Sequence, residues 1–166
     1  RIREREYRAI GAGRGVVADI DQYDRSPQLY RQIAVWDPDK LQLVAMYRYV
    51  YTRDVLERIG EHGLRTRTLF TFSEPFKKRV LSSAVELARS VVNSEASAAI
   101  RGLHAVWFGL AALVARNPCV RYYFGNVTIP ATMPGAATAE IGAMLRAACP
   151  PGEGLETGDV AARVKI

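Results

Sequence analysis

The chain has 166 residues, of which 49% are hydrophobic and 24% are charged, and its formal net charge is +6. This length and composition fit one globular domain with a buried core, and they exclude an intrinsically disordered chain. The positive charge favours acidic partners, whereas the absence of zinc-finger spacing, an RNP-like motif and a lysine-rich tail argues against nucleic acid.

The first predicted element is a charged helix over residues 1–10, which the glycines of GAGRG at 11–15 end. A glycine-rich loop beside an arginine can cradle a phosphate. Nucleotide fingerprints, however, place such a loop after a strand and before a helix, and this loop lacks both neighbours. We therefore interpret it as a turn.

The next segment, DIDQYD, brings Asp19, Asp21 and Asp24 together within six residues. Its spacing begins like a calcium-binding EF-hand loop, but the central glycine and the terminal glutamate are missing. We expect these carboxylates to bind a cationic amine or to pair with arginines elsewhere in the chain.

A β-hairpin is expected over residues 30–37 and 41–51, because DPDK between them has turn chemistry. Alternation in the second strand places Val44, Met46, Arg48 and Val50 on one face and Leu41, Leu43, Ala45, Tyr47 and Tyr49 on the other. Arg48 thus lies on an otherwise apolar face. A buried arginine needs a partner, so we expect a carboxylate or a ligand beside it.

Helices and strands are expected to alternate along the rest of the chain. They are a helix over 52–62 with Thr52 as N-cap, a strand over 68–72, a helix that Ser73 caps, a strand over 85–92, a helix over 98–117, a strand over 119–129 and a helix over 136–148. The helix over 98–117 has apolar positions at helical spacing, namely Ile100, Leu103, Trp107, Leu110, Ala111 and Val114. Its apolar run over 103–115 is too short to span a bilayer.

This order predicts an α/β fold with a mixed central sheet and helices on both faces. We assign residues 1–149 to one domain and residues 150–166 to a linker and tail, and we expect the chain to be part of a longer protein. Two cysteines without a CxxC motif fit a reduced, cytoplasmic setting. No metal site is expected, because the two cysteines and two histidines are well separated.

Two charged residues, Glu86 and Arg89, lie within the predicted strand 85–92. Alternation places Glu86 and Ser90 on one face and Arg89 on the other. One interpretation is a structural ion pair with other elements. The functional interpretation is that Glu86 is a general base that takes a proton from an attacking amine, directly or through water.

Six segments resemble, in order and spacing, the bacterial hemolysin-like GNAT acyltransferases: DIDQYD, IAVWDP, MYRYV, LFTFSEPF, ELARSVV and RYYFGNVTI. That family includes N-acyl-glycine synthases and ornithine lipid N-acyltransferases, and the pattern is also similar to acyl-homoserine lactone synthases. The resemblance covers residues 5–145. It implies a GNAT fold, in which the sheet splays between the strands of Glu86 and Tyr122 and holds the donor's phosphopantetheine arm.

The resemblance implies an N-acyltransferase that moves a long-chain acyl group to the primary amine of an amino acid such as glycine or ornithine. The donor would be acyl-acyl carrier protein or acyl-coenzyme A, used as a co-substrate without a permanently bound cofactor. The product would be an N-acyl amino acid or a lyso-lipid. The implied catalytic residues are Glu86 and Arg89, and the implied substrate-binding residues are Asp19, Asp21, Asp24, Arg48 and Ser90.

One departure from related acetyltransferases bears on the donor. They carry an Arg/Gln-x-x-Gly-x-Gly/Ala loop before the long helix, where backbone amides hold the pyrophosphate of coenzyme A. Residues 93–102, NSEASAAIRG, lack this loop. Its absence favours an acyl carrier protein as partner, and the positive charge agrees because carrier proteins are acidic.

We expect a cytoplasmic location with peripheral contact to the inner membrane. In a non-catalytic binding module, residues 1–14 and 103–115 would contact an anionic membrane. Two alternatives stay open. The first is a non-catalytic lipid- or carrier-binding module on the same fold. The second is autoinducer synthesis, which would consume S-adenosylmethionine.

Overall fold

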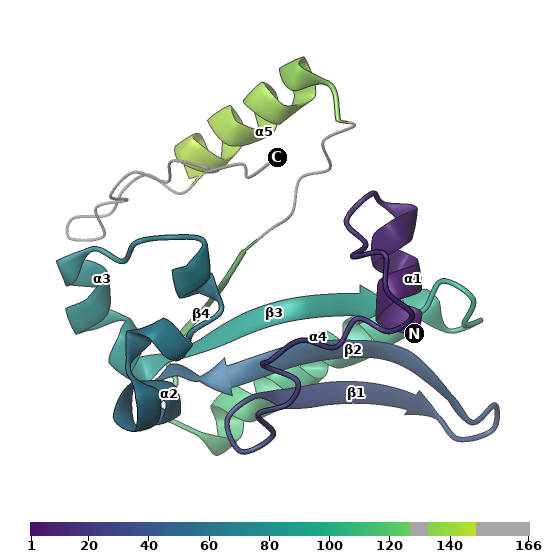
Figure 1. Ribbon diagram of the computed structural model, residues 1–166, viewed down its shortest axis with the longest axis horizontal. Helices are drawn as coiled ribbons and strands as arrows, with labels where there is room; N and C mark the ends of the chain where they lie inside the picture. Colours follow the sequence, from purple (N-terminus) through teal and green to yellow (C-terminus); the bar gives the residue numbers. More distant parts are fainter. Residues whose placement is uncertain (127–132, 149–166) are drawn as a thin grey trace.

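The computed structural model describes residues 1–126 and 133–148. Its described strands form one sheet in the order β1-β2-β3-β4 (Figure 1). The strands are β1 (Arg31–Asp37), β2 (Gln42–Tyr51), β3 (Ala84–Val92) and β4 (Tyr122–Gly125). The first three pair antiparallel, and β4 pairs parallel with β3, so the sheet is mixed as predicted.

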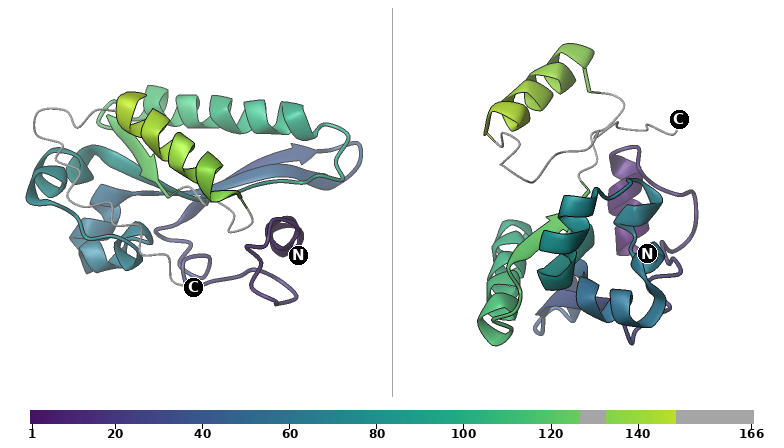
Figure 2. Two further views of the ribbon diagram at one scale, coloured as in Figure 1. Left: turned by 90° about the horizontal axis from the view of Figure 1, so that it is seen from above. Right: turned by 90° about the vertical axis from the view of Figure 1, so that its left-hand side faces the viewer.

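Helices cover both faces of the sheet, which confirms the predicted α/β class. The described helices are α1 (Ile2–Ala9), α2 (Thr52–Ile59), α3 (Glu74–Arg79), α4 (Ala99–Arg116) and α5 (Gly135–Ala148), with 3-10 turns at Glu61–Gly63, Thr66–Thr68 and Leu81–Ser83. Figure 2 shows α4 along one face of the sheet, with α1, α2 and the loop between α1 and β1 on the other face.

The two faces of the sheet contribute to two separate cores. The α4 side contains Tyr49, Val85, Leu87, Leu110 and Val120, and the opposite side contains Tyr23, Leu29, Tyr30, Val50, Val55, Leu64, Phe72 and Leu81. Tyr49 and Val50 are neighbours in β2 and belong to different cores, as alternation in a strand requires. Because both faces are covered, β3 is buried continuously over residues 84–88.

α4 packs on the sheet through a narrow stripe, Gly102, Val106 and Leu110. A methyl group at Gly102 would lie 2.5 Å from Cγ1 of Val44, so only glycine permits this approach. Val44 therefore lies beneath α4, although alternation placed it on the opposite face. The reason is an irregularity in the β1–β2 register beside it.

Only part of the apolar row at helical spacing on α4 is buried. Ile100 is 76% exposed and Trp107 57% exposed, so these side chains point away from the sheet. The sheet contacts the stripe one position away, where the glycine lets the helix approach. By length and composition alone, α4 is the one helix in the described ranges that could cross a membrane.

The predicted strand over 68–72 is wrong: Thr66–Thr68 is a 3-10 helix, and residues 69–73 have no regular structure. The nearby backbone N–H groups of Arg65 and Thr66 donate to the carboxylate of Glu86 rather than to a neighbouring strand. The apolar residues of this segment still enter the core, because Phe72 packs against Phe76.

The helix boundaries differ from the predicted ones for local reasons. α2 ends at Ile59, because Gly60 adopts a φ of 78°. Thr52 does not cap α2, and its hydroxyl instead donates to the carbonyl of Ala84 at 2.8 Å. Ser73 caps α3 as predicted and accepts from the N–H of Phe76 at 3.3 Å.

At the C-terminal end, the predicted strand over 119–129 is shortened to β4, and residues 127–129 lie outside the described residues. The predicted helix over 136–148 is confirmed as α5. The predicted linker and tail, residues 150–166, also lie outside the described residues.

Candidate functional site

A bulge in β3 determines the direction of Arg89. Between the pairs Arg48–Ala88 and Met46–Val91, β3 contains one residue more than β2. Arg89 has a φ of 55°, a left-handed conformation that is uncommon for a residue other than glycine. The alternation-based prediction for Arg89 is wrong, because the extra residue turns its side chain onto the face opposite α4.

On that face, the predicted acidic and basic residues form one ionic cluster. Its members are Asp19, Asp21 and Asp24 from the loop between α1 and β1, Arg48 from β2, Arg89 from β3, and two residues that the sequence did not single out, Arg3 and Arg14. Three carboxylates thus face four guanidinium groups. The arrangement brings together residues from widely separated parts of the sequence.

Arg48 is the buried centre of this ionic cluster, with no exposed surface. Its Nη1 lies 2.6 Å from Oδ1 of Asp21 and 2.9 Å from Oδ1 of Asp24, which confirms the predicted carboxylate partner. The guanidinium also lies over the rings of Tyr23 and Tyr30, at 5.4 and 5.5 Å. The rings compensate partly for Nε and Nη2, which have no hydrogen-bond partner in the described part of the chain.

Arg3 attaches α1 to the acidic loop. It is 6% exposed, and its Nε donates to Oδ2 of Asp19 at 2.8 Å. Its other nitrogens reach the Asp19 carbonyl and the Asp24 carboxylate. In the sequence, Arg3 is one of several arginines in a charged helix, and no spacing separates it from the others.

The glycine-rich loop at 11–15 holds an anion, but that anion belongs to the protein. The N–H groups of Arg14 and Gly15 donate to the carboxylate of Glu4 at 3.1 and 2.9 Å. Glu4 is 3% exposed, so this loop is already occupied. The interpretation of GAGRG as a turn without a phosphate therefore fits the structure.

Glu86 lies beneath the loop at residues 64–66 and has no exposed surface. Its Oε2 accepts from the Tyr30 hydroxyl at 2.8 Å and from the Arg65 N–H at 3.1 Å, and its Oε1 accepts from the Thr66 N–H at 2.5 Å. Burial and the neighbouring Glu86 charge raise the pKa of Tyr30, so the hydroxyl stays protonated and donates. In this geometry the carboxylate anchors the loop.

Arg48 and Glu86 therefore have matching tasks on adjacent strands. Arg48 pairs with Ala88 and Glu86 pairs with Val50 across β2 and β3, so both side chains are on the same face. The buried cation holds the acidic loop, and the buried anion holds the loop of Arg65. The carboxylates of the acidic loop are thus paired with a buried cation, and the backbone N–H groups of the loop of Arg65 are paired with a buried hydrogen-bond acceptor.

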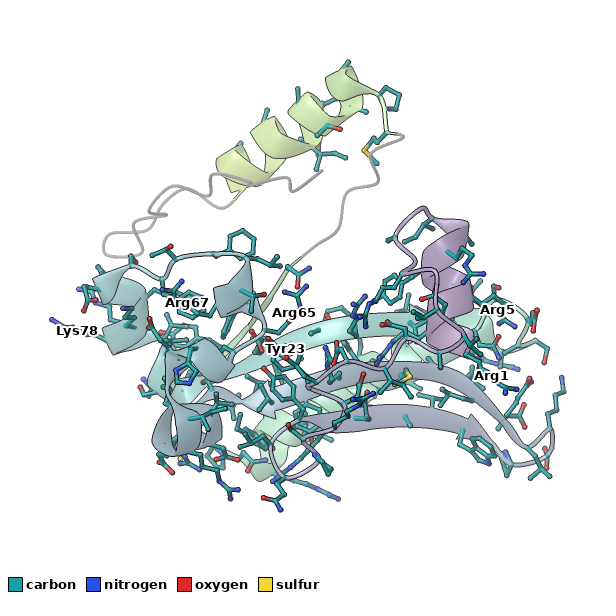
Figure 3. All side chains as sticks on the ribbon, viewed as in Figure 1. Arg1, Arg5, Tyr23, Arg65, Arg67 and Lys78 are labelled. Atoms are coloured by element: carbon teal, nitrogen blue, oxygen red, sulfur yellow. The ribbon has the colours of Figure 1, made fainter. Side chains whose placement is uncertain are left out.

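An open depression of about 620 Å³ lies between the two loops. Its lining residues are Arg14, Ile20, Asp21, Gln22, Tyr23, Arg25, Arg65 and Arg89. Figure 3 shows Tyr23 and Arg65 close together above the sheet. Glu86 is fully buried and does not line this depression, and Ser90 is exposed, with its carbonyl accepting from the Tyr7 hydroxyl.

Two further observations concern the surroundings of the site and its capacity to bind a metal. The parallel pairing of β3 with β4 ends at Leu87 and Gly125, directly before the bulge. Within the described ranges, no group of three His, Cys, Asp or Glu side chains is arranged to hold a metal ion.

The ionic cluster should make stability depend on pH. Burial would raise the pKa of Asp24, but hydrogen bonds from Arg3 and the Asp21 N–H, with the charge of Arg48, outweigh burial and hold it well below its ordinary value. Because the pKa of Asp24 is lower in the folded protein than in the unfolded chain, its ionised carboxylate stabilises the fold at pH values above the pKa of the unfolded chain. This stability is lost as pH falls through the pKa of the folded protein.

We therefore expect the melting temperature, measured by circular dichroism, to fall as the pH drops below about 4. Asp24→Asn should start from a lower melting temperature and lose less of it over the same range. Asp39→Asn, in the exposed turn after β1, is the matched control and should follow the wild type. Equal acid slopes for Asp24→Asn and the wild type would contradict this prediction.

Comparison with known proteins identifies the family to which the sequence of this chain is similar. The model of a family described as an acetyltransferase (GNAT) domain matches residues 2–103, which include the whole ionic cluster and Glu86. The chain is 41% identical over 138 residues to a glycine N(alpha)-acyltransferase of Phocaeicola vulgatus and 40% identical over 136 residues to one of Bacteroides thetaiotaomicron.

Each alignment covers 78% of this chain but only 42% and 40% of those relatives, so the chain spans about two fifths of their length. No solved structure matches the chain significantly.

Proposed function

The chain belongs to the GNAT acetyltransferase family, and from this membership we propose that it transfers an acyl group from a thioester to the primary amine of an amino acid. The amine nitrogen attacks the thioester carbonyl, the C–N bond forms, the C–S bond breaks and the thiol leaves. The acceptor's ammonium group first releases one proton to give the attacking amine, and the nitrogen's second proton leaves with the sulfur as the thiol. The relatives named glycine N(alpha)-acyltransferase support an amino acid as acceptor.

The observation that carries this proposal is one available carboxylate oxygen in the depression. Oδ1 of Asp21 accepts from the N–H groups of Tyr23 and Asp24, at 3.0 and 3.1 Å, and lies 2.6 Å from Arg48. Within the described residues, Oδ2 accepts no hydrogen bond, and Nε of Arg89 lies 3.8 Å from it. We assign Oδ2 to the acceptor's ammonium group, since a carboxylate is the natural partner of a cationic amine.

The other predicted site residues then support Asp21. Arg48 fixes its Oδ1, and Asp19 and Asp24 are proposed to balance the charges of the surrounding arginines. Arg89 is proposed to order Asp21 for the acceptor. The bulge at Arg89 and Ser90 interrupts the ladder between β2 and β3, and we propose that its backbone amides stabilise the negative charge on the thioester oxygen.

Glu86 has two candidate roles. The resemblance implies a catalytic role, in which Glu86 is the general base that takes a proton from the amine. The structure supports a second role better, because Glu86 has no exposed surface and accepts from three donors, of which two belong to the loop of Arg65. In that role Glu86 is a positioning residue, and its replacement acts through Arg65.

For the donor, we propose a long-chain acyl-acyl carrier protein in preference to acyl-coenzyme A. The long helix α4 begins at Ala99 after Ala98, without a glycine loop for a pyrophosphate. The net charge of +6 suits an acidic carrier. With such a donor we place the reaction in the cytoplasm.

A second candidate rests on the apolar face of α4. Ile100 and Phe108 are each 76% exposed and Trp107 is 57% exposed. This face, with a basic chain, would suit a lipid-binding module without catalysis.

Purified protein, incubated with a long-chain acyl-acyl carrier protein or acyl-coenzyme A and with glycine or ornithine, should form an N-acyl amino acid and release one thiol per amide. Mass spectrometry detects the amide, and a thiol reagent measures the release. Liposome flotation without amide formation from any amine would overturn the proposal and support the lipid-binding module. The donor that gives the higher kcat/KM decides between carrier protein and coenzyme A.

A further inference from the structure

The depression contains two arginines that the ionic cluster does not neutralise, Arg25 and Arg65. Within residues 1–126 and 133–148, neither pairs with a carboxylate: Arg65 donates to the hydroxyl of Thr68, and Arg25 is exposed. The two other arginines of the lining are already paired, since Arg14 and Arg89 lie 3.3 and 3.5 Å from Asp19. The depression thus has cationic charge available for a ligand.

We propose that Arg25 and Arg65 bind the free carboxylate of the acceptor while Oδ2 of Asp21 binds its ammonium group. The inference rests on the proposed function and makes it narrower: the acceptor class is the α-amino acid with a free carboxylate. An α-amino acid carries its ammonium group and its carboxylate on the same carbon atom. A site for it therefore needs a carboxylate and a guanidinium in one hollow, and this depression has both.

Arg65 is held in place for this task. Its own N–H donates to Glu86 at 3.1 Å, and the N–H of Thr66 donates to the same carboxylate at 2.5 Å. The backbone that carries the guanidinium is therefore fixed to a fully buried group of the sheet. Fixing the backbone reduces the entropy that the arginine loses on binding, and its fork can bind a carboxylate through two parallel hydrogen bonds.

The charges favour a single carboxylate over a polyphosphate. Asp21 lies in the lining, and among the described residues its Oδ2 accepts no hydrogen bond, with Nε of Arg89 at 3.8 Å. A pyrophosphate beside this oxygen would be repelled, whereas a zwitterion is attracted at both ends. The size does not select glycine, because about 620 Å³ also admits larger amino acids. Charge, rather than shape, selects the acceptor class.

The test measures kcat/KM for glycine and for glycinamide, which keeps the amine but has no carboxylate. Wild type should prefer glycine. Arg65→Ala should lower kcat/KM for glycine by about 10- to 100-fold, mainly through a higher KM, as expected for one charge-assisted contact. Its kcat/KM for glycinamide should stay unchanged. Arg65→Lys should recover part of the loss, and Arg25→Ala should shift the preference in the same direction.

Arg67→Ala is the matched control, because this arginine of the same loop region pairs with Glu61 at 3.1 Å and does not line the depression. It should leave the glycine-to-glycinamide ratio unchanged. One outcome would overturn this inference alone. In it the wild type acylates glycine, Arg65→Ala loses equal kcat/KM for glycine and glycinamide, and Arg25→Ala keeps the wild-type ratio of the two. A wild-type protein that acylates no amine would overturn the proposed function, and this inference with it.

Discussion

Replacement of Glu86 by glutamine is expected to reduce kcat/KM for glycine by at least about 10-fold. Glu86 has no exposed surface, and its two oxygens accept from Tyr30, Arg65 and Thr66. Glutamine has the same shape but presents an NH₂ donor where one oxygen accepted. A buried donor would then face a donor, which costs about 1–3 kcal/mol of unfolding free energy and releases the loop of Arg65.

Both roles of Glu86 predict this loss, but they differ in its signature. If Glu86 is the base, the variant loses kcat, and the ascending limb of the pH–rate profile disappears. If Glu86 positions Arg65, KM for glycine rises and the pH–rate profile keeps its shape. The double variant Glu86→Gln/Arg65→Ala then has a kcat/KM no lower than that of the poorer single variant. Steady-state kinetics between pH 5 and 9 separate the two.

Glu61→Gln is the control for a lost carboxylate in the same region, since Glu61 is partly exposed and pairs with Arg67 and Lys77. It should keep wild-type kinetics. Wild-type turnover in Glu86→Gln would remove Glu86 from both roles.

The sequence predicts most of this fold because its signals are local. The turn DPDK and the alternation around Arg48 suffice for the hairpin, and the apolar central strand around Glu86 is typical of a sheet covered on both faces. The need of a buried arginine for a carboxylate correctly linked Arg48 with the acidic segment. Elementary rules of burial therefore reach far into the site.

The remaining features depend on contacts between distant segments. The bulge that redirects Arg89 is a register shift between β2 and β3, and a single strand carries no sign of it. Arg3 differs from its neighbours only through contact with Asp19 and Asp24. The segment 68–72 has strand-like residues, but Glu86 binds the backbone just before it, so tertiary hydrogen bonds outweigh local propensity.

The same ionic cluster allows a stability experiment that does not depend on the reaction. Arg48→Met should lower the free energy of unfolding by about 3–5 kcal/mol, because methionine fills similar space but leaves the carboxylates of Asp21 and Asp24 without their buried cation. This loss is a large share of the 5–15 kcal/mol that is typical for a domain. Urea denaturation followed by circular dichroism measures it.

Two comparisons make this prediction specific to the buried pair. Arg53→Met removes an exposed arginine that lies 4.0 and 3.9 Å from Asp54 and Glu57, and it should cost less than about 1 kcal/mol. Adding Asp21→Asn to Arg48→Met should restore part of the stability, since the uncompensated charge is then removed. A loss below about 1 kcal/mol in Arg48→Met would mean that the acidic loop does not depend on Arg48, and the assignment of Asp21 Oδ2 to the acceptor would lose its structural basis.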